Sequence, residues 1–289
     1  MNTSLVTNYL YWRWRFLFAA GERQRYKSTL RKLPRLIESN KFDEIEMLLL
    51  SCGSFQAANN FRDLVNFFRS SRDKISKIVE IGAFNFASST LINCLKRENT
   101  FFFGFDNWDL GGPKARAMAE WRVGFFPNSH VISGHPLPSS VQAKELENTD
   151  MLVIDGNHSF QSTVADCACF DFLKDGATVF FHDCGLGNRI WGCFWVFYLL
   201  QKYEIICPSD QRFASCLSNV DPRRKPAVNE GEKPGIEFAI GVLNQAQFLQ
   251  FQELLQNTQL LWDEVRDRFN MRAGLDMTAQ FYLWDEWFC

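Results

Sequence analysis

From residue 77 onwards, short apolar runs alternate with stretches of helical periodicity, and this alternation limits what the chain can fold into. The runs are apolar on nearly every residue, which is typical of strands buried on both faces of a sheet. We expect strands at 77–82, 100–106, 129–134, 150–155, 177–183, 203–208 and 236–243. We expect helices between them at 88–97, 114–125, 140–147, 160–174 and 188–202. This alternation predicts a doubly wound α/β fold: a seven-stranded, mostly parallel sheet with helices on both faces.

The first 75 residues contain no strand signal, and we expect them to form an N-terminal helical extension to an α/β domain at 76–289. Apolar residues recur through 28–72 at the three- and four-residue spacing of amphipathic helices. Residues 13–35 carry eight Lys or Arg against one acid, Glu22, and two of the arginines interrupt an apolar run, which argues against a transmembrane segment. Such a basic, aromatic-rich segment can contact an anionic membrane surface, but packing on the main domain is the more common arrangement.

The composition narrows the classes of function. A net charge of −2 argues against nucleic-acid binding. The nine Cys are scattered, with no C-x-x-C pair, so we expect reduced thiols in a cytoplasmic protein without a zinc site. The 29 Phe indicate a large core or an apolar surface for assembly, for example in a homo-oligomer.

The ends of the first two predicted strands carry candidate ligand-binding residues, because ligands of such sheets bind beyond the carboxyl ends of the strands. Glu80 and Gly82 end the first strand, and the glycine lets the backbone turn close to a ligand. Ser88 can cap the following helix, whose N-terminus favours a negatively charged group. Asp106 ends the second strand, where an acid can accept hydrogen bonds from ribose hydroxyls. Alternatively Asp106 caps its own loop, and Trp108 packs under it instead of stacking on a base.

The fourth and fifth strands each end in an acid and a histidine: Asp155 with His158, and His182 with Asp183. Two acids at neighbouring strand ends can share a proton or hold a hard cation such as Mg²⁺. His158 is suited to act as a general base near neutral pH. The alternative is that the acids cap helices and the histidines are ordinary loop residues. Two such strand ends in succession favour a site.

With these motifs in view, residues 77–185 resemble class I S-adenosylmethionine-dependent methyltransferases. The resemblance rests on E-x-G after the first strand, the acid after the second, and "IDGNHSFQSTVADCACFDFLKDGATVFFHD" across the fourth and fifth. The branch with I-D-G-x-H followed by H-D includes sugar and macrolide-sugar O-methyltransferases and cephalosporin-hydroxylase-like proteins. The resemblance implies a Rossmann-like sheet with an antiparallel last strand, and S-adenosylmethionine bound over the first three strands.

The resemblance also implies roles for individual residues. The residues implied for cofactor binding are Glu80, Gly82, Asn85, Ser88, Asp106, Trp108, Gly134 and His135. It implies that Asp155 and Asp183 hold Mg²⁺ and that His158, with Asp155, deprotonates an acceptor hydroxyl. The expected reaction is O-methylation of a sugar, a glycan or another small polyhydroxy acceptor.

The chain departs from the family pattern at several positions, including Asp175-Gly176-Ala177 in place of P-G-G and Cys184 after Asp183. Phe86 stands where the family has a second glycine in the first loop, and Asn157 stands where it has an acid. We interpret Asn157 as structural. Phe86 and the high Phe content support an alternative, a methyltransferase-fold protein without catalysis that serves in binding or assembly. A nicotinamide-dependent oxidoreductase is disfavoured, because G-x-G-x-x-G is absent.

Overall fold

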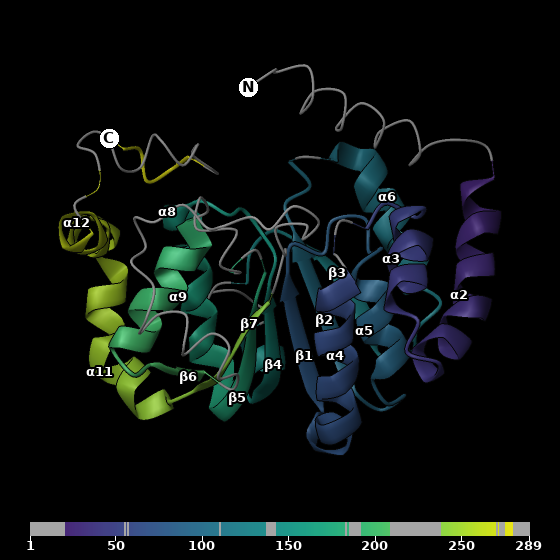
Figure 1. Cartoon of the computed structure of the whole chain (residues 1–289), viewed down its shortest axis with the longest axis horizontal. Coiled ribbons are helices and arrows are strands. Elements are labelled where there is room, and N and C mark those ends of the chain that lie inside the picture. The colour runs from purple at the N-terminus through teal and green to yellow at the C-terminus, as the bar shows by residue number, and fades with distance from the viewer. Residues whose placement is uncertain are drawn as a thin grey trace, which may run out of the picture.

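A central sheet with helices on both sides forms the protein, as Figure 1 shows. The computed structural model describes residues 21–54, 56, 58–109, 111–136, 143–182, 184, 192–208, 238–269, 271 and 275–279. The strands are β1 (Lys77–Ile81), β2 (Phe101–Asp106), β3 (Ser129–Ser133), β4 (Thr149–Ile154), β5 (Leu173–Phe181), β6 (Ile206–Pro208) and β7 (Ala239–Leu243). Each lies within or close to a predicted range.

The strand order is β3-β2-β1-β4-β5-β7-β6. Strands β1 to β5 pair in parallel, whereas β7 runs antiparallel to both β5 and β6. The predicted seven-stranded, mostly parallel sheet is therefore confirmed. So is the antiparallel last strand that the family resemblance implied.

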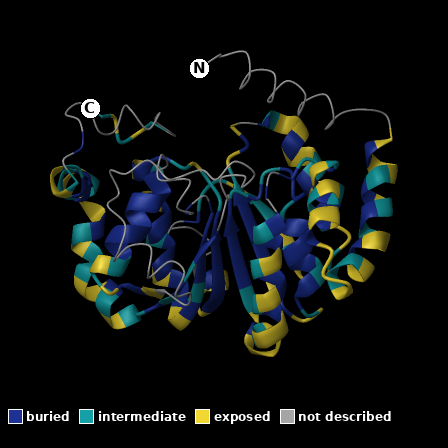
Figure 2. Ribbon diagram, viewed as in Figure 1, coloured by how far each residue is buried: buried dark blue, intermediate teal, exposed yellow. Residues whose placement is uncertain are grey.

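Helices cover both faces of the sheet (Figure 1). One face carries α2 (Glu22–Glu38), α3 (Phe42–Leu50), α4 (Ala58–Ser71), α5 (Ser89–Leu95) and α6 (Gly112–Val123). The other carries α8 (Phe160–Asp166), α9 (Gly192–Lys202), α11 (Gln245–Gln256) and α12 (Thr258–Arg268). Short helical turns are η1 (Arg72–Lys74), α7 (Ala143–Leu146) and η2 (Cys167–Phe172). Figure 2 shows the buried strands between helices whose outer sides are exposed.

The two cores follow from the alternation of side chains along a strand. In β2, Phe102 belongs to the core under α2–α6 and Phe103 to the core under α8–α12. The predicted N-terminal helical extension is present from residue 21, and it shares the first of these cores. The Phe67 ring of α4, for example, lies 5.0 Å from the Phe180 ring of β5. The N-terminal helices thus bury one face of the sheet.

The helix predicted at 160–174 is shorter in the structure. α8 ends at Asp166, a 3₁₀ segment follows, and β5 begins at Leu173. Cys167, Cys169, Phe170 and Phe172 are all buried. In an α-helix Cys167 and Cys169 would point to opposite sides, whereas three residues per turn align Cys167 with Phe170 and Cys169 with Phe172. The tighter winding therefore lets all four apolar side chains enter the core.

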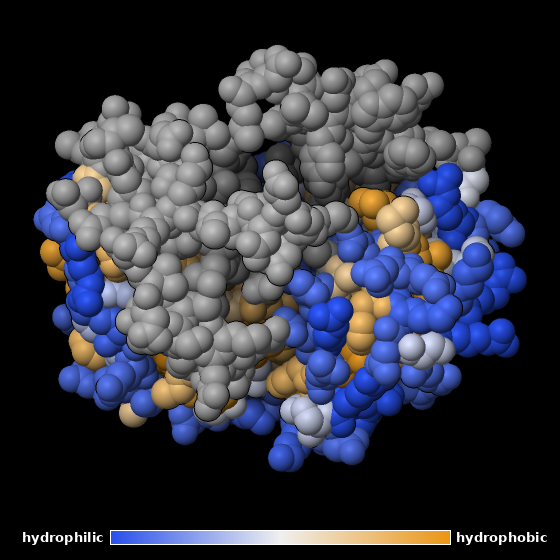
Figure 3. Space-filling view, in the orientation of Figure 1, coloured by the Kyte–Doolittle hydropathy of each residue, from blue (hydrophilic) through white to orange (hydrophobic). Residues whose placement is uncertain are grey.

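None of the helices in the described ranges combines the length and the apolar character needed to cross a bilayer. The first 20 residues, which include part of the basic segment, lie outside the described residues. On the face shown in Figure 3, the described surface is mostly hydrophilic with scattered hydrophobic side chains. The exposed large hydrophobic residues are Met47, Leu50, Phe101, Phe125, Leu249 and Leu260.

Candidate active site

Backbone hydrogen bonds align the carboxyl ends of the central strands. The amide of Asp155 donates to the Ile81 carbonyl at 2.9 Å, and the amide of His182 donates to the Ile154 carbonyl at 2.9 Å. The ladder thus continues one residue beyond β4 and β5, which brings Asp155 and His182 to the same rim.

Gly82 makes this close approach possible. Its φ of +90° is one that L side chains rarely adopt, and a Cβ on it would lie 2.0 Å from the Asp155 carbonyl oxygen. Only glycine fits where the β1 loop crosses the end of β4. Gly82 therefore positions Asp155 as well as the turn itself.

Phe86 lies in the same loop and points into the core. Its backbone has a φ of +66°, the conformation in which a glycine would be comfortable. Its side chain is fully buried, with its ring centroid 5.5 Å from that of Phe102. Burying a Phe side chain contributes about 1.5–3 kcal/mol, which offsets the roughly 1–2 kcal/mol cost of the left-handed backbone.

Asp106 organises the loops that follow β1 and β2. Its Oδ2 accepts a hydrogen bond from the Phe84 amide at 2.7 Å, and its Oδ1 accepts one from the Trp108 amide at 2.5 Å. Burial raises the pKa of Asp106, and the two amide hydrogen bonds oppose that rise. The Trp108 indole is buried and donates to the Phe84 carbonyl at 2.8 Å. Asp106 thus accepts hydrogen bonds from the backbone of both loops, and Trp108 packs beneath them.

Asn85 and Ser88 are tied to the N-terminal helices. The side-chain Nδ2 of Asn85 donates to the Gly53 carbonyl at 3.2 Å, and its Oδ1 accepts from the buried Arg122 at 3.0 Å. The Ser88 hydroxyl lies 2.9 Å from the hydroxyl of Ser54. Ser88 stands at the N-cap of α5 but makes no side-chain cap hydrogen bond.

Glu80 is the most deeply buried acid near the site. Its Oε2 accepts a short hydrogen bond from the Ser89 hydroxyl. Its Oε1 is buried and has no hydrogen-bond partner among the residues that the structure describes. Burial raises the pKa of Glu80 to about 8. The side chain therefore holds a proton at neutral pH and can donate as well as accept a hydrogen bond.

Gly134 and His135 follow β3, and the sequence analysis missed the partner of His135. Gly134 has a φ of +105° and its amide donates to the Asp106 carbonyl; among the residues that the structure describes, no atom lies within 4 Å of a Cβ placed on it. The Nε2 of His135 lies 2.6 Å from Oδ1 of Asp166 on α8. Burial raises the pKa of Asp166, which His135 partly offsets. Asp166 lies within the stretch that carries the family resemblance, but nothing in the sequence indicated His135 as its partner.

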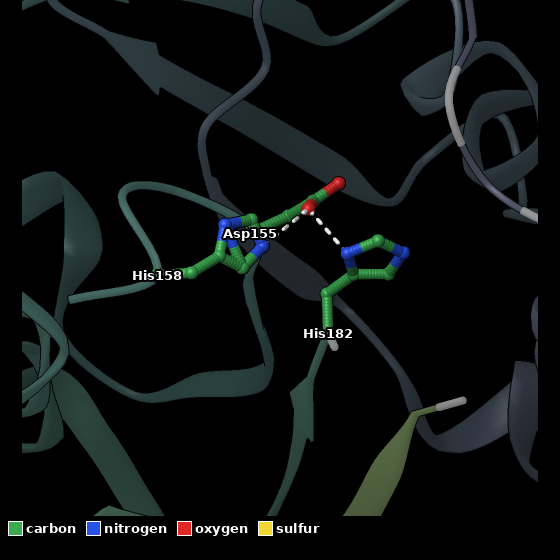
Figure 4. A group of neighbouring side chains, drawn as sticks. All are labelled: Asp155, His158 and His182. Atoms are coloured by element: carbon green, nitrogen blue, oxygen red, sulfur yellow. Dashed lines mark ion pairs between the residues drawn. The ribbon is translucent and has the colours of Figure 1, made fainter. Parts of the chain in front are cut away.

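Asp155, His158 and His182 face one another, as Figure 4 shows. Oδ1 of Asp155 lies 2.8 Å from Nδ1 of His182 and 3.8 Å from Nε2 of His158. Burial alone would raise the pKa of Asp155, but the two histidines and a hydrogen bond from Gln56 together hold it below its usual value. Asp155 is therefore a carboxylate at neutral pH.

The three side chains offer ligand atoms that all lie within 4.8 Å of one another, close enough to surround a metal ion. Asp183, the second predicted metal ligand, lies outside the described residues. Two imidazoles and one carboxylate suit Zn²⁺ or Fe²⁺, whereas Mg²⁺ prefers oxygen ligands. The described residues thus do not match the ligand set expected for Mg²⁺.

Two other residues complete this end of the sheet. Asn157 accepts a hydrogen bond from the Ser159 amide at 2.9 Å, and Ser159 caps α8. Asn157 therefore shapes the turn into the helix, in line with the structural role expected for it. Gln56, which no sequence motif indicated, donates from Nε2 to Oδ2 of Asp155 at 3.1 Å.

Residues 79–184 match a family model described as a methyltransferase domain. None of the curated proteins compared with the chain matches it.

Several solved structures are similar at low identity. An O-methyltransferase from Bacillus cereus in complex with SAH is 11% identical, with a TM-score of 0.41, and the match covers 75% of this chain and 91% of that one. The O-methyltransferase TomG from Streptomyces achromogenes in complex with SAM is 13% identical, with a TM-score of 0.36, and the match covers 63% of this chain and 80% of that one. Fibrillarin from Aeropyrum pernix with bound S-adenosyl-L-methionine is 12% identical, with a TM-score of 0.41, and the match covers 58% of this chain and 66% of that one. These likenesses are too distant to carry an argument about the acceptor. On the family match, residues 79–184 form a methyltransferase domain.

Proposed function

We propose that this protein transfers a methyl group from S-adenosylmethionine to a hydroxyl oxygen of a sugar, a glycan or another small polyhydroxy acceptor, with His158 as the general base. The observation that carries the proposal is the cluster of Asp155, His158 and His182 at one rim of a methyltransferase domain. When bound, the cofactor supplies an electrophilic methyl group on a positively charged sulfur.

The described residues fit such a cofactor along the ends of β1 to β3. Each Asp106 oxygen accepts one backbone hydrogen bond, and since a carboxylate accepts about four, ribose hydroxyls can still be bound. The unpartnered Oε1 of Glu80 is available to a donor on the methionine part. The open space beside Gly134 suits the adenine. Asn85, Ser88 and Trp108 act by shaping this wall, and His135 borders it.

His158 is suited to take the proton from the acceptor. The negative charge of Asp155, 3.8 Å away, stabilises the imidazolium that forms. His182 holds the same carboxylate from the other side, which limits the movement of Asp155. The geometry therefore favours a base that works near neutral pH.

Metal assistance is a second candidate, favoured by the spacing of the three ligand atoms. The original expectation was Mg²⁺ on Asp155 and Asp183. A metal on the described residues would use His158 as a ligand, so it would replace the general base rather than assist it. Activity of protein treated with a chelator, and then supplied with Mg²⁺, Mn²⁺ or Zn²⁺ in turn, separates the two routes. Full activity after chelation supports His158 as the base.

The test of the proposed function begins with binding. Calorimetry with S-adenosylmethionine and S-adenosylhomocysteine should show binding, and mass spectrometry of a sugar panel should show a gain of one methyl group. His158→Ala should largely abolish methyl transfer, because it removes the proposed base. Its matched control is His130→Ala, which should stay active, since His130 is exposed on β3. No heat with millimolar cofactor would contradict the proposal and favour the non-catalytic assembly protein.

Other expectations remain predictions: a cytoplasmic location, no nucleic-acid partner, a homo-oligomer, and membrane-surface contact of the basic N-terminal segment as the less common alternative to its packing on the main domain. Flotation with liposomes, with and without residues 1–35, tests the last of these.

A further inference from the structure

Gln56 lies in the turn between α3 and α4, outside the matched methyltransferase domain and 99 residues before its partner Asp155. Its side chain is 4% exposed. Its Nε2 donates to Oδ2 of Asp155, whereas the two histidines face Oδ1. Each oxygen of the carboxylate thus has its own neighbours. Rotation of the carboxylate would break the contacts on both sides.

The turn that carries Gln56 is anchored to the methyltransferase domain. The Ser54 hydroxyl accepts a hydrogen bond from the backbone amide of Gln56 at 3.3 Å, and it also contacts the Ser88 hydroxyl. The Cys52 carbonyl accepts from Arg122 on α6 at 2.8 Å. These contacts hold Gln56 in place beside Asp155.

Stability alone does not explain a glutamine at this position. Its Oε1 is buried without a hydrogen-bond partner among the described residues. Leaving a polar atom unsatisfied in this way costs about 1–3 kcal/mol, so an apolar side chain of similar size would serve packing better. The hydrogen bond to Asp155 supplies a reason for the amide.

We infer that Gln56 is a positioning residue that orients the Asp155 carboxylate toward His158 and His182, so that the N-terminal helical extension is part of the active site. The inference rests on the proposed function for its catalytic consequence. The donated hydrogen bond stabilises the ionised carboxylate and fixes which oxygen faces the histidines.

Gln56→Leu tests this inference, because it removes the donor at similar size. Its matched control is Asn60→Leu, which also removes a buried amide from the extension, but one with no hydrogen bond to its side chain among the described residues. The chain has four histidines, so protein labelled with ¹⁵N at histidine gives a simple spectrum in which His158 and His182 report the protonation of Asp155.

In Gln56→Leu, the pH at which these two signals sense Asp155 should rise, and in Asn60→Leu it should stay. Methyl transfer by Gln56→Leu should fall on the order of tenfold in kcat, with the KM for S-adenosylmethionine unchanged and the acid limb of the pH profile moved upwards. If both variants leave the histidine titration as in the wild type, or shift it equally, the inference is overturned.

The two proposals fail separately. The histidine titration needs neither cofactor nor acceptor, so it tests the Gln56–Asp155 contact even in a protein that binds no S-adenosylmethionine. Absence of cofactor binding in the wild type would overturn the proposed function. A normal kcat in Gln56→Leu, in a wild type that is active, would overturn only the role of Gln56.

Discussion

The rim above β1 and β2 and the rim above β4 and β5 use the same kinds of residue for different purposes. Above β2, each oxygen of Asp106 accepts a hydrogen bond from a backbone amide of an adjacent loop. Above β4, Asp155 faces two imidazoles and an amide that come from three separate segments. An acid at a strand end is therefore an ambiguous signal, and the partners decide its role.

The difference is electrostatic as well as geometric. Burial raises the pKa of Asp106, since two neutral amides do not outweigh desolvation. At Asp155 the histidines and Gln56 outweigh it, and the pKa falls below its usual value. The first rim is held by backbone hydrogen bonds, whereas the second gathers titratable side chains around one carboxylate. The four predictions that follow test this division.

The largest effect should come from the rim above β4 and β5. We expect His158→Ala and Asp155→Asn each to lower kcat by about 10²–10⁴-fold, the usual contribution of a general base. Affinity for S-adenosylhomocysteine, measured by calorimetry, should change little, since the proposed function assigns these residues to the acceptor and not to the cofactor. Full activity in either variant would contradict the assignment.

Phe86→Ala should lower the stability of the fold without removing a group that binds the cofactor or takes part in the reaction. Removing a fully buried Phe costs about 3–5 kcal/mol of unfolding free energy, measured by urea denaturation. Phe101→Ala, at a Phe that is 44% exposed, is the control and should stay within about 0.5 kcal/mol of the wild type. Where Phe86→Ala still folds, its affinity for S-adenosylhomocysteine should be retained. A large gain in affinity would instead show that the Phe86 ring had crowded the cofactor.

Asp106→Asn should have a smaller effect on stability. An amide can accept only one of the two backbone hydrogen bonds and turns its own donors toward the other, a loss of about 1–3 kcal/mol. Affinity for S-adenosylhomocysteine should also fall. Asp109→Asn, at an exposed acid in the same loop, should leave both quantities unchanged. Equal behaviour of the two variants would refute the role of Asp106.

The last prediction concerns Glu80 and the pH dependence of stability. Its pKa is about 8 in the folded protein against 4.5 ordinarily, so the folded state keeps a proton that the unfolded state releases. The resulting stability is present at low pH and is lost as the pH rises through about 8. Glu80→Gln cannot titrate, so its unfolding free energy should fall less between about pH 5 and 8 than that of the wild type. Parallel curves for the two proteins would exclude this account.

The strands were predictable because their signal is local. Continuous apolar runs located all seven, and the strand-end rule selected Asp106 and Asp155 as candidates. The helix at 160–174 was predicted too long, because the arrangement of Cys167 and Phe170 in the core, not the pattern along the chain, sets its end. Gln56 carried no signal, and neither did the pairing of Asp166 with His135, since each contact joins segments far apart along the chain.

The sequence by itself determined the α/β architecture, the N-terminal helices and the positions of the strand ends. These follow from the order of apolar and polar residues along the chain, which sets the side chains that can be buried. Only the tertiary structure decided which polar groups meet there. Asp106 became a loop cap and Asp155 the centre of a titratable cluster, according to what the neighbouring segments brought within hydrogen-bond distance. Hydrogen bonds and charge interactions act over a few ångströms, so they depend on packing between residues far apart in the chain, such as Gln56 and Asp155 at a separation of 99 positions.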